Sequence, residues 1–471
     1  MARTVSSGDQ ATLGIAARID RLPRSVHLLG LVARIAGGGW LEFYELAMPA
    51  YISLGLIGAG IYTKQSTGPL DGLFDPKSYA TFLASFYVGM FIGTMALGKV
   101  SDRFGRKAAF TVPMIGYATA TLLVAASSSP LLIDTFRLIA GIGVGIQLIN
   151  NDAYISELTP QRLRGRYIAT ALLISFTSYP VAALLGYAFV PHQPLGIAGW
   201  RWVVIIGGAL GFLVLLLRRG LTESPRWLAS RGRTAEAERA LSAIEARVER
   251  ETGAPLPEPV PASADGISRK GSWTEMFRGK YLRRTTMMSV FQFTQTISVY
   301  GFTSWVPILL IDKGITVVSS LQYTFEIAIL TPFGGLLAIL LAERFERKWQ
   351  LVFCGVEIAV VGLVFAQMHN VVGIVIVGGL VTLGNYWMIG IFHTYNAELF
   401  PTRIRSQAVS FNFSWSRVSS IFVGYMVSGL LSAYGTNGVF ALIVGAMAVL
   451  TVFIATMGPR TNGQRLETLA S

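Results

Sequence analysis

The chain has 471 residues, of which 52% are hydrophobic and only 14% are charged, and its mean hydropathy is +0.53. That length would allow two or three soluble domains, but apolar runs of about 20 residues recur along the sequence, and each is long enough to cross a bilayer as a helix. The composition therefore excludes an ordinary soluble protein and predicts an all-α, multi-pass membrane protein.

We predict twelve membrane-spanning helices, six on each side of a long polar segment. The predicted spans are approximately 30–58, 79–98, 108–127, 131–152, 167–190, 199–219, 285–311, 320–341, 349–368, 372–394, 408–431 and 438–457. They predict two six-helix bundles, 30–219 and 285–457, joined by a cytoplasmic central loop with short helices at 220–284. The remaining segments, 1–29 and 458–471, are predicted to be cytoplasmic tails.

The net charge of +13 at pH 7 would also suit a nucleic-acid-binding protein, so the distribution of the charge decides. With an even number of spans and both ends inside, only four of the 39 Lys and Arg residues would be external: Lys64, Lys77, Arg201 and Lys313. This excess of cations in the inner loops is the positive-inside pattern. It predicts cytoplasmic termini in a bacterial inner (plasma) membrane and requires no nucleic-acid partner.

The first predicted span contains two acidic residues, Glu42 and Glu45, spaced three apart so that they share one helix face. Ionisable groups within a span are costly and usually face the interior of a bundle or an aqueous cleft, where a carboxylate can carry a proton. We interpret both as candidate proton carriers, and Glu45 is the stronger because it lies deeper. The alternative is a hydrated, structural carboxylate near the cytoplasmic mouth.

Two charged motifs occur twice in the chain at one spacing. The run 98–107 follows the second span and returns 241 positions later as 339–348, and the run 157–164 is echoed by 398–405. Two independent motifs repeated at the same offset indicate that one half of the chain is a copy of the other.

In the first copy of the longer motif, Gly98 and Gly105 permit close approach of helices and a tight turn. Asp102 is placed to cap a neighbouring helix N-terminus, and Arg106 is placed to form a forked contact with a carboxylate such as Glu157. Simple anchoring of the inner loops by cations is the alternative, but it explains neither Asp102 nor the glycines.

These repeats resemble the major facilitator superfamily of transporters, and the resemblance extends over nearly the whole chain. It implies two pseudo-symmetric six-helix bundles and an intracellular latch that is closed when the transporter faces outward. The second copy departs from the family pattern at Ile339, Glu343 and Glu346, so we expect its latch to be the weaker. The residues that would form the gate or latch are Gly98, Asp102, Arg103, Gly105, Arg106, Glu157, Arg164, Glu223, Arg226, Glu343, Arg347, Glu398 and Arg405.

The fourth predicted span contains Arg137, followed by the alternating glycines Gly141, Gly143 and Gly145. Glycines at this spacing lie outside any βαβ context, so nucleotide binding is rejected, and small residues allow helices to pack closely in lipid. The run resembles the fourth helix of the sugar-porter and organic-ion branch, in which an Arg partners a carboxylate of the first helix. The resemblance implies an ion pair of Arg137 with Glu45 that couples proton movement to a rocking motion.

Polar and aromatic residues within the spans predict the lining of a substrate site, because each needs a partner that lipid does not supply. The seventh span weakly resembles the glutamine-bearing seventh helix of sugar porters, although its amides would also serve to hold helices together. We interpret His393 and Glu357 as structural. The predicted lining residues are Tyr44, Gln292, Gln295, Tyr300, Trp305, Asn385, Tyr386, Asn412 and Trp415.

Arg417 lies within the eleventh predicted span and needs either an acidic partner or an anionic ligand. The run at 416–421 resembles the eleventh helix of organic-anion and aromatic-acid transporters, which implies that Arg417 attracts a substrate carboxylate. The alternative is a fixed ion pair with Glu326 of the eighth span.

The sequence contains no hydrolase triad, metal-ligand cluster or phosphate-binding loop, so we expect neither an enzyme nor a bound metal or cofactor. It predicts a secondary transporter in which buried charges line an aqueous cleft between the two bundles. The expected partners are a small organic anion, such as an aromatic or heterocyclic carboxylate, protons and the lipid bilayer, and the expected functional unit is a monomer. A sugar or polyol porter, an exporter of organic cations or drugs, and a nutrient sensor that binds without transport are the alternatives.

Overall fold

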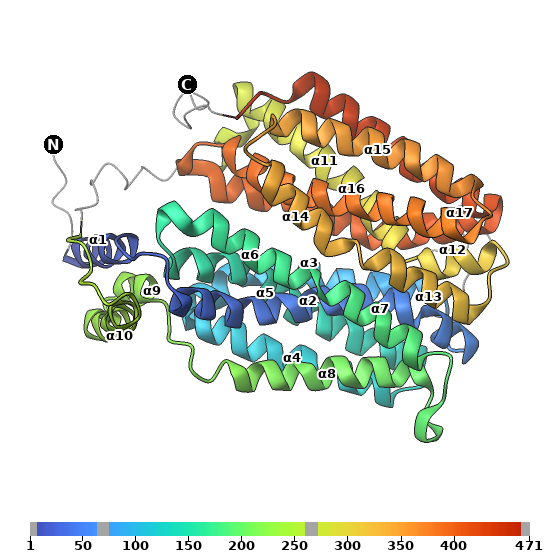
Figure 1. Cartoon of the computed structure of the whole chain (residues 1–471), viewed down its shortest axis with the longest axis horizontal. Coiled ribbons are helices and arrows are strands. Elements are labelled where there is room, and N and C mark those ends of the chain that lie inside the picture. The colour runs from blue at the N-terminus through green and yellow to red at the C-terminus, as the bar shows by residue number, and fades with distance from the viewer. Residues whose placement is uncertain (1–6, 64–74, 260–271, 463–471) are drawn as a thin grey trace.

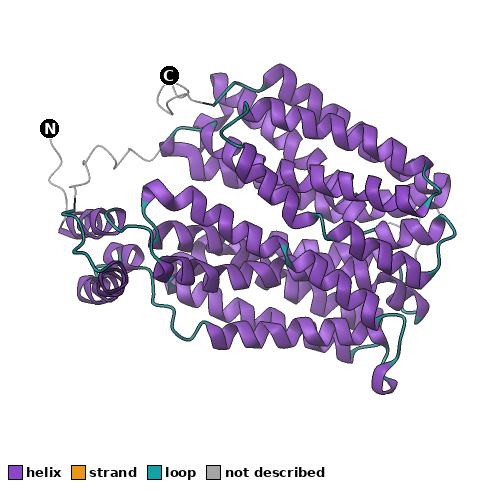
Figure 2. Ribbon diagram, in the orientation of Figure 1, coloured by secondary structure: helices purple, strands orange, loops and turns teal. Residues whose placement is uncertain are grey.

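The protein is described by a computed structural model that covers residues 7–63, 75–259 and 272–462. Within these ranges every extended regular element is a helix (Figure 2), and the remaining pairing is an isolated bridge between Thr63 and Ser78. Eight of the described helical segments are long and apolar enough to cross a membrane. The all-α fold class predicted from the sequence is thus confirmed.

The helices of the first half pack together as one group (Figure 1). Ser25 caps the first of them through a hydrogen bond from Leu28 N, and Pro130 occupies the first turn of the fourth, where no backbone N–H is needed. The elements are α2 (Val26–Gly58), α3 (Tyr79–Phe104), α4 (Arg106–Ala126), α5 (Pro130–Leu158), α6 (Arg164–Phe176), α7 (Ser178–Phe189) and α8 (Gly199–Leu217).

The second half forms a matching group of helices above the first in Figure 1. Its elements are α11 (Gly279–Thr303), α12 (Val306–Asp312), α13 (Val317–Ala328), α14 (Thr331–Leu341), α15 (Arg347–Gln367), α16 (Val371–Glu398) and α17 (Thr402–Met457). The two spans predicted at 408–431 and 438–457 are two helices that share the label α17 and meet at a kink at Gly435, where φ is +62°. A glycine adopts that backbone conformation without steric strain.

Three predicted spans are broken in the middle. The breaks separate α6 from α7, α11 from α12 and α13 from α14, and the second piece of each pair carries a proline in its first turn: Pro180, Pro307 or Pro332. Proline cannot donate a backbone hydrogen bond to the preceding turn, so it favours a new helix start at that point. Broken helices within a membrane are tolerated where they are buried in protein or line a cavity.

The alternating glycines of α5 allow α3 and α5 to touch backbone to backbone. A Cβ atom on Gly141 would overlap the carbonyl oxygen of Phe86, and one on Gly145 would overlap that of Met90. The close packing expected from this run is therefore what the structure contains.

Three further helices lie at the end of the molecule that carries both chain termini, called here the terminal end (Figure 1). They are α1 (Ser7–Asp20), α9 (Pro225–Ser230) and α10 (Thr234–Thr252), which share a small apolar core that includes Ile15, Trp227 and Leu241. The predicted surface helix of the central loop corresponds to α10, whereas α1 shows that the segment predicted as a plain tail contains a helix.

Candidate functional site

Glu45 and Arg137 form a buried ion pair inside the first half. Arg137 Nη1 donates a hydrogen bond of 2.8 Å to Glu45 Oε2, and Thr121 Oγ1 donates one of 2.7 Å to Glu45 Oε1. The acid comes from α2, the base from α5 and the hydroxyl from α4, so the pair joins three helices. Charges at this depth in a membrane protein need such partners to be stable.

The pair is closed off from solvent. Arg137 is 0% exposed and Glu45 is 2% exposed, and the Arg137 guanidinium lies 4.1 Å from the ring centroid of Phe86 on α3. A cation over an aromatic face and out of water is stabilised by about 2 kcal/mol. We expected these two charges to line an aqueous cleft between the halves; they lie instead within the first half, behind the aromatic side chains of α3.

A second polar cluster surrounds Glu42, which lies closer than Glu45 to the terminal end of α2. Asn151 Nδ2 on α5 donates a hydrogen bond of 2.8 Å to Glu42 Oε1. Arg218, the residue after α8, donates to two backbone carbonyls of α2, and its guanidinium lies 3.3 Å from the ring centroid of Phe110. The cluster therefore links α2, α4, α5 and α8 at a level between the buried ion pair and the terminal end.

Several buried polar atoms of this cluster have no hydrogen-bond partner within the described part of the chain. They are both amide atoms of Gln147, Asn151 Oδ1, Arg218 Nη1 and the Tyr117 hydroxyl. Such atoms are rare in folded proteins and mark positions for water or ligand. Apart from Glu42, this cluster was not predicted from the sequence. Gln147 and Asn151 share one face of α5, and that shared face could have indicated it. Arg218 lies at the end of a predicted span, where a cation is common.

Arg417 lies at the boundary between the two halves. It is 6% exposed on α17, and its charge has Tyr300, His393 and Glu42 as neighbours, from helices of both halves. Among the residues whose side chains are described, it makes no ion pair; Glu326 instead accepts a hydrogen bond from its own helix. A buried guanidinium without an acidic partner is well suited to bind an anion.

The predicted amide residues are buried in the second half. Asn385 Oδ1 accepts a hydrogen bond of 3.0 Å from Ser298 Oγ, and Asn412 Nδ2 donates one of 3.1 Å to Asn396 Oδ1. Gln292 Nε2 and Asn385 Nδ2 have no partner among the described residues, so they are free to donate to a ligand. All four amide residues predicted to line the site are buried: Gln292, Gln295, Asn385 and Asn412.

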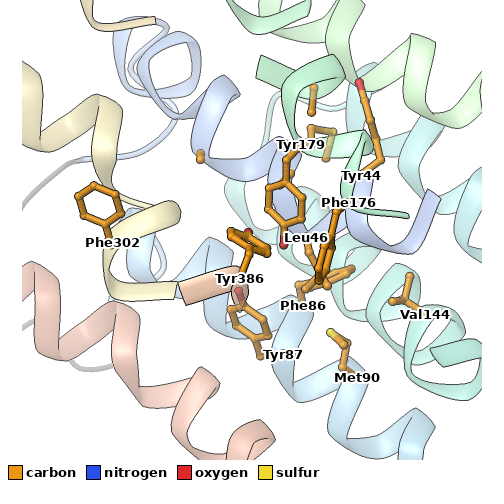
Figure 3. Packing of buried hydrophobic residues seen from close by; sticks show 14 of the residues in the cluster. Tyr44, Leu46, Phe86, Tyr87, Met90, Val144, Phe176, Tyr179, Phe302 and Tyr386 are labelled. Carbon is orange, nitrogen blue, oxygen red and sulfur yellow. The ribbon is translucent and has the colours of Figure 1, made fainter. Parts of the chain in front are cut away.

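Aromatic rings from the two halves meet at their boundary (Figure 3). The ring centroid of Tyr386 on α16 lies 5.0 Å from those of Phe176 and Tyr179, at the junction of α6 and α7. The ring of Tyr300 lies 5.0 Å from that of Tyr87 on α3. These contacts place Tyr300 and Tyr386, two of the predicted lining residues, between the halves.

A cavity of about 10 Å³, roughly the space of one water molecule, lies beside these rings at the level of the helix breaks. Thr303 ends α11, Thr331 begins α14, and Tyr179 lies in the first turn of α7. The breaks therefore lie beside hydroxyl-bearing side chains at the boundary between the halves, which is where membrane transporters have their substrate sites. The hydroxyl-bearing residues that line the cavity are Tyr51, Tyr179, Thr303, Thr324, Thr331 and Thr382.

One of the aromatic residues predicted to flank a substrate lies elsewhere. Tyr44 is buried in the first half, and its hydroxyl donates a hydrogen bond of 2.8 Å to a backbone carbonyl of α8; Figure 3 shows its side chain pointing away from the boundary aromatics. Trp415 is 38% exposed on α17. Trp305, by contrast, is buried between the halves, with its ring 5.2 Å from that of Tyr79. Helical periodicity alone did not distinguish these faces.

Direct hydrogen bonds join the halves at the end opposite the termini. The Tyr79 hydroxyl donates to Ser304 O at 3.3 Å, and the Tyr425 hydroxyl donates to Thr81 Oγ1 at 3.2 Å. Tyr79 and Thr81 lie at the start of α3, whose other end reaches the terminal end. Hydrogen bonds therefore hold the two halves together at the end away from the termini.

The first charged motif forms a bonded cluster at the terminal end. Arg106 Nε and Nη2 each lie 3.0 Å from Glu157 Oε1. Glu223 Oε1 accepts hydrogen bonds from the backbone N–H groups of Arg106 and the next residue, at 2.9 and 3.2 Å, and so caps the N-terminus of α4. We expected Asp102 to be such a cap; the surroundings of Gly98 and the side chain of Asp102 lie outside the described part of the chain.

Gly105 precedes α4 with a φ of +93°, which supports the predicted turn. Arg226 pairs with Asp20 of α1 at 3.1 Å, so this arm reaches the N-terminal helix. Arg103 and Arg164 make no ion pair among the described side chains, and Arg103 is exposed. The cluster is thus built from Arg106, Glu157 and Glu223, with Arg226 attached to α1.

The second copy is built differently. Arg347 pairs with Glu398 at 3.3 Å, but the exposed Glu343 side chain makes no ion pair within the described residues, and that of Arg405 lies outside them. Glu346, which replaces a glycine of the first copy, accepts hydrogen bonds from the backbone N–H groups of Thr461 and the next residue. The substitution thus ties the C-terminal segment to α15.

Comparison with known proteins places this geometry in context. Residues 40–471 match the family model described as "Sugar (and other) transporter". The chain is 31% identical to a putative metabolite transport protein of Bacillus subtilis over 95% of its own length and 96% of the relative's. It is 28% identical to the niacin transporter NiaP of Acinetobacter baylyi, over 97% of the chain and all of that protein. It is 26% identical to the 4-hydroxybenzoate transporter PcaK of the same organism, over 79% and 82% of the two chains.

The fold also matches solved structures. The xylose transporter XylE from E. coli, in a partially occluded inward open conformation, superimposes with a TM-score of 0.74, with 18% sequence identity, over 94% of this chain and all of that one. At that identity the match concerns the fold alone.

Proposed function

The chain belongs to the sugar (and other) transporter family of the major facilitator superfamily, and from this premise we propose that it is a proton-coupled transporter of small organic anions. Members of this family are membrane transporters and not enzymes. The proposed substrates are aromatic or heterocyclic monocarboxylates, carried by alternating exposure of a site between the two halves. In this proposal both termini are cytoplasmic, because the inner loops carry the excess of cations.

The observation that supports this substrate class is the state of Arg417. A buried cation at the boundary, without an acidic partner among the described residues, can form two parallel hydrogen bonds with a carboxylate. The rings of Tyr300 and Tyr386 lie at the same boundary, the Nδ2 of the neighbouring Asn385 has no partner among the described residues, and together they suit a planar body with polar substituents. Two relatives are named for niacin and 4-hydroxybenzoate, both of which carry a carboxyl group on a ring.

The proton would be carried by Glu45. Arg137 neutralises its carboxylate at 2.8 Å, so protonation of Glu45 would release the guanidinium from α2. The unpaired atoms around Glu42, Gln147 and Tyr117 provide places for water on the side toward the terminal end. In this scheme the proton leaves through the first half while the substrate leaves between the halves.

The alternative with support of its own is a sugar or polyol porter. The unpaired Nε2 of Gln292 and Nδ2 of Asn385 would bind hydroxyl oxygens as well as carboxylate oxygens, and the fold matches a xylose transporter. Arg417 argues against it, because a neutral substrate would leave that charge unpaired.

The experiment is transport by purified protein in proteoliposomes. We expect counterflow of labelled nicotinate or 4-hydroxybenzoate, and no counterflow of xylose. Arg417→Gln should reduce the apparent affinity for the carboxylate by at least about 30-fold, because removing one partner of a buried charge pair costs about 2–5 kcal/mol. Arg219→Gln, which removes a cation beyond the end of α8, is the control and should leave counterflow unchanged.

Three outcomes would reject this function. Counterflow of xylose with none of a carboxylate would favour the porter of neutral substrates. Accumulation of organic cations in inverted vesicles would favour an exporter. Binding of a carboxylate without any exchange would favour a sensor.

A further inference from the structure

A basic hollow lies where the central helix α10 meets the start of α2. It encloses about 650 Å³ and is lined by Val26, His27, Gly30, Leu31, Arg34, Arg247, Arg250 and Glu251. Neither the buried ion pair nor the boundary between the halves includes any of these residues. The hollow is therefore separate from the proposed transport site.

The charge in the hollow is positive. Arg34, Arg247 and Arg250 are exposed, and none of them forms an ion pair with a described residue. Glu251 is the one acid in the lining, and its two oxygens already accept hydrogen bonds from the backbone N–H groups of Val26 and His27. That carboxylate caps α2 and makes no ion pair with the guanidinium groups, and three arginines against one glutamate leave the hollow with a net charge of about +2.

The guanidinium groups converge from two elements. Arg247 and Arg250 are three apart on α10 and so share one face, and Arg34 comes from α2. The electrostatic neighbours of His27 are Arg247, Arg34 and Glu251, which places it among them. Several guanidinium forks around one concavity match the oxygens of a phosphate group, to which each can donate two hydrogen bonds.

The rim of the hollow is apolar. Val26 is 73% exposed and Leu29 is 43% exposed, both in the first turn of α2, just before the membrane span predicted to begin at residue 30. Apolar side chains exposed at this level face the acyl chains of the membrane, and a basic pocket next to them lies at the depth of the lipid headgroups. A free phosphate ion would use the cations but not this rim.

We propose that the hollow of Arg34, Arg247 and Arg250 binds the phosphate headgroup of an anionic phospholipid from the leaflet on the terminal side, with its acyl chains lying along Val26 and Leu29. The bound lipid holds α10 against α2. The central segment is then fixed to the first half by lipid as well as by the Glu251 cap. The proposal does not depend on which substrate is transported.

The test is native mass spectrometry of the full-length protein titrated with phosphatidylglycerol, phosphatidylcholine or inorganic phosphate. Wild type should retain phosphatidylglycerol in preference to phosphatidylcholine. Arg247→Gln and Arg250→Gln should each weaken phosphatidylglycerol binding about fivefold, and the double variant about 25-fold, since a basic residue near an anionic membrane contributes about this factor. Arg239→Gln is the matched control, because Arg239 is an exposed arginine of α10 outside the hollow that also contacts the carbonyl four residues before it.

Each other outcome overturns the proposal. Equal retention of phosphatidylcholine would show that charge is not recognised, and equal loss in Arg239→Gln would show a diffuse surface effect. Binding of inorganic phosphate as strong as that of phosphatidylglycerol would show that the hollow is an anion site that does not recognise lipid. Size-exclusion profiles of the variants identical to wild type establish that the exposed substitutions leave the fold intact.

Discussion

Replacing Glu45 by Leu removes the negative half of the buried ion pair and leaves Arg137 without a charge partner. The remaining contacts of the guanidinium include a 3.4 Å hydrogen bond from Nη2 to the backbone carbonyl of residue 45 and the rings of Phe86 at 4.1 Å and Phe82 at 5.2 Å. None of these neutralises the charge. Breaking a buried pair on one side costs about 3–5 kcal/mol, whereas replacing both partners by apolar residues of similar volume is often close to neutral. We therefore expect Glu45→Leu to be strongly destabilising and Glu45→Leu/Arg137→Met to recover most of the loss.

The assay is thermal unfolding in detergent, followed by tryptophan fluorescence, for wild type, both single variants and the double variant. Thr121→Val is the reference, since it removes one hydrogen bond to the carboxylate and should cost about 2 kcal/mol. A double variant no more stable than Glu45→Leu would refute the reasoning, because the two charges would then contribute independently. In proteoliposomes the double variant should exchange substrate but fail to accumulate it when an inward proton gradient is imposed.

The remaining predictions concern the terminal end. Gly105→Ala should destabilise the protein by about 1–3 kcal/mol and displace the Glu223 cap, because the backbone at φ +93° and ψ 169° is accessible almost only to glycine; Gly116→Ala, where an added Cβ meets open space, should be near neutral in the same thermal assay. Burial raises the pKa of Glu245, but hydrogen bonds from Arg18 and Arg21 outweigh that effect and leave the pKa below its usual value. A lowered pKa in the folded state means that this contact stabilises fully above the ordinary carboxyl pKa and is lost as pH falls below it. The protection factors of the α1 amides, referred to the intrinsic exchange rate at each pH, should therefore fall below about pH 4. In Glu245→Gln they should be low at every pH, and unchanged α1 protection at low pH would contradict this.

Much of the architecture could be predicted from the sequence, because it follows from local patterns. Apolar runs longer than a bilayer thickness predict spans, and two motifs repeated at one offset predict two related halves. The contact of Arg137 with Glu45 was also accessible, since a charge within a span needs a partner and the family resemblance supplied one. These features depend on one segment or one pair at a time.

The features that were missed depend on several segments together. The prolines at the breaks, Pro180, Pro307 and Pro332, are present in the sequence, but a proline within a span does not always break the helix. Pro49, for example, lies inside the continuous helix α2. The face that Tyr44 presents depends on how α2 rotates against α8, and periodicity does not fix that rotation. The role of Gln147 depends on neighbours on three other helices, and the spacing of residues in the sequence does not reveal these contacts.

The most direct test of the account is to measure the pH inside proteoliposomes while a carboxylate is added outside. The account predicts that nicotinate or 4-hydroxybenzoate acidifies the lumen of vesicles that contain the wild-type protein. Arg417→Gln should abolish this signal by loss of substrate binding, and Glu45→Gln should abolish it while substrate exchange continues. Uptake of the carboxylate by wild type without any movement of protons, or acidification that persists in Glu45→Gln, would contradict the central claim.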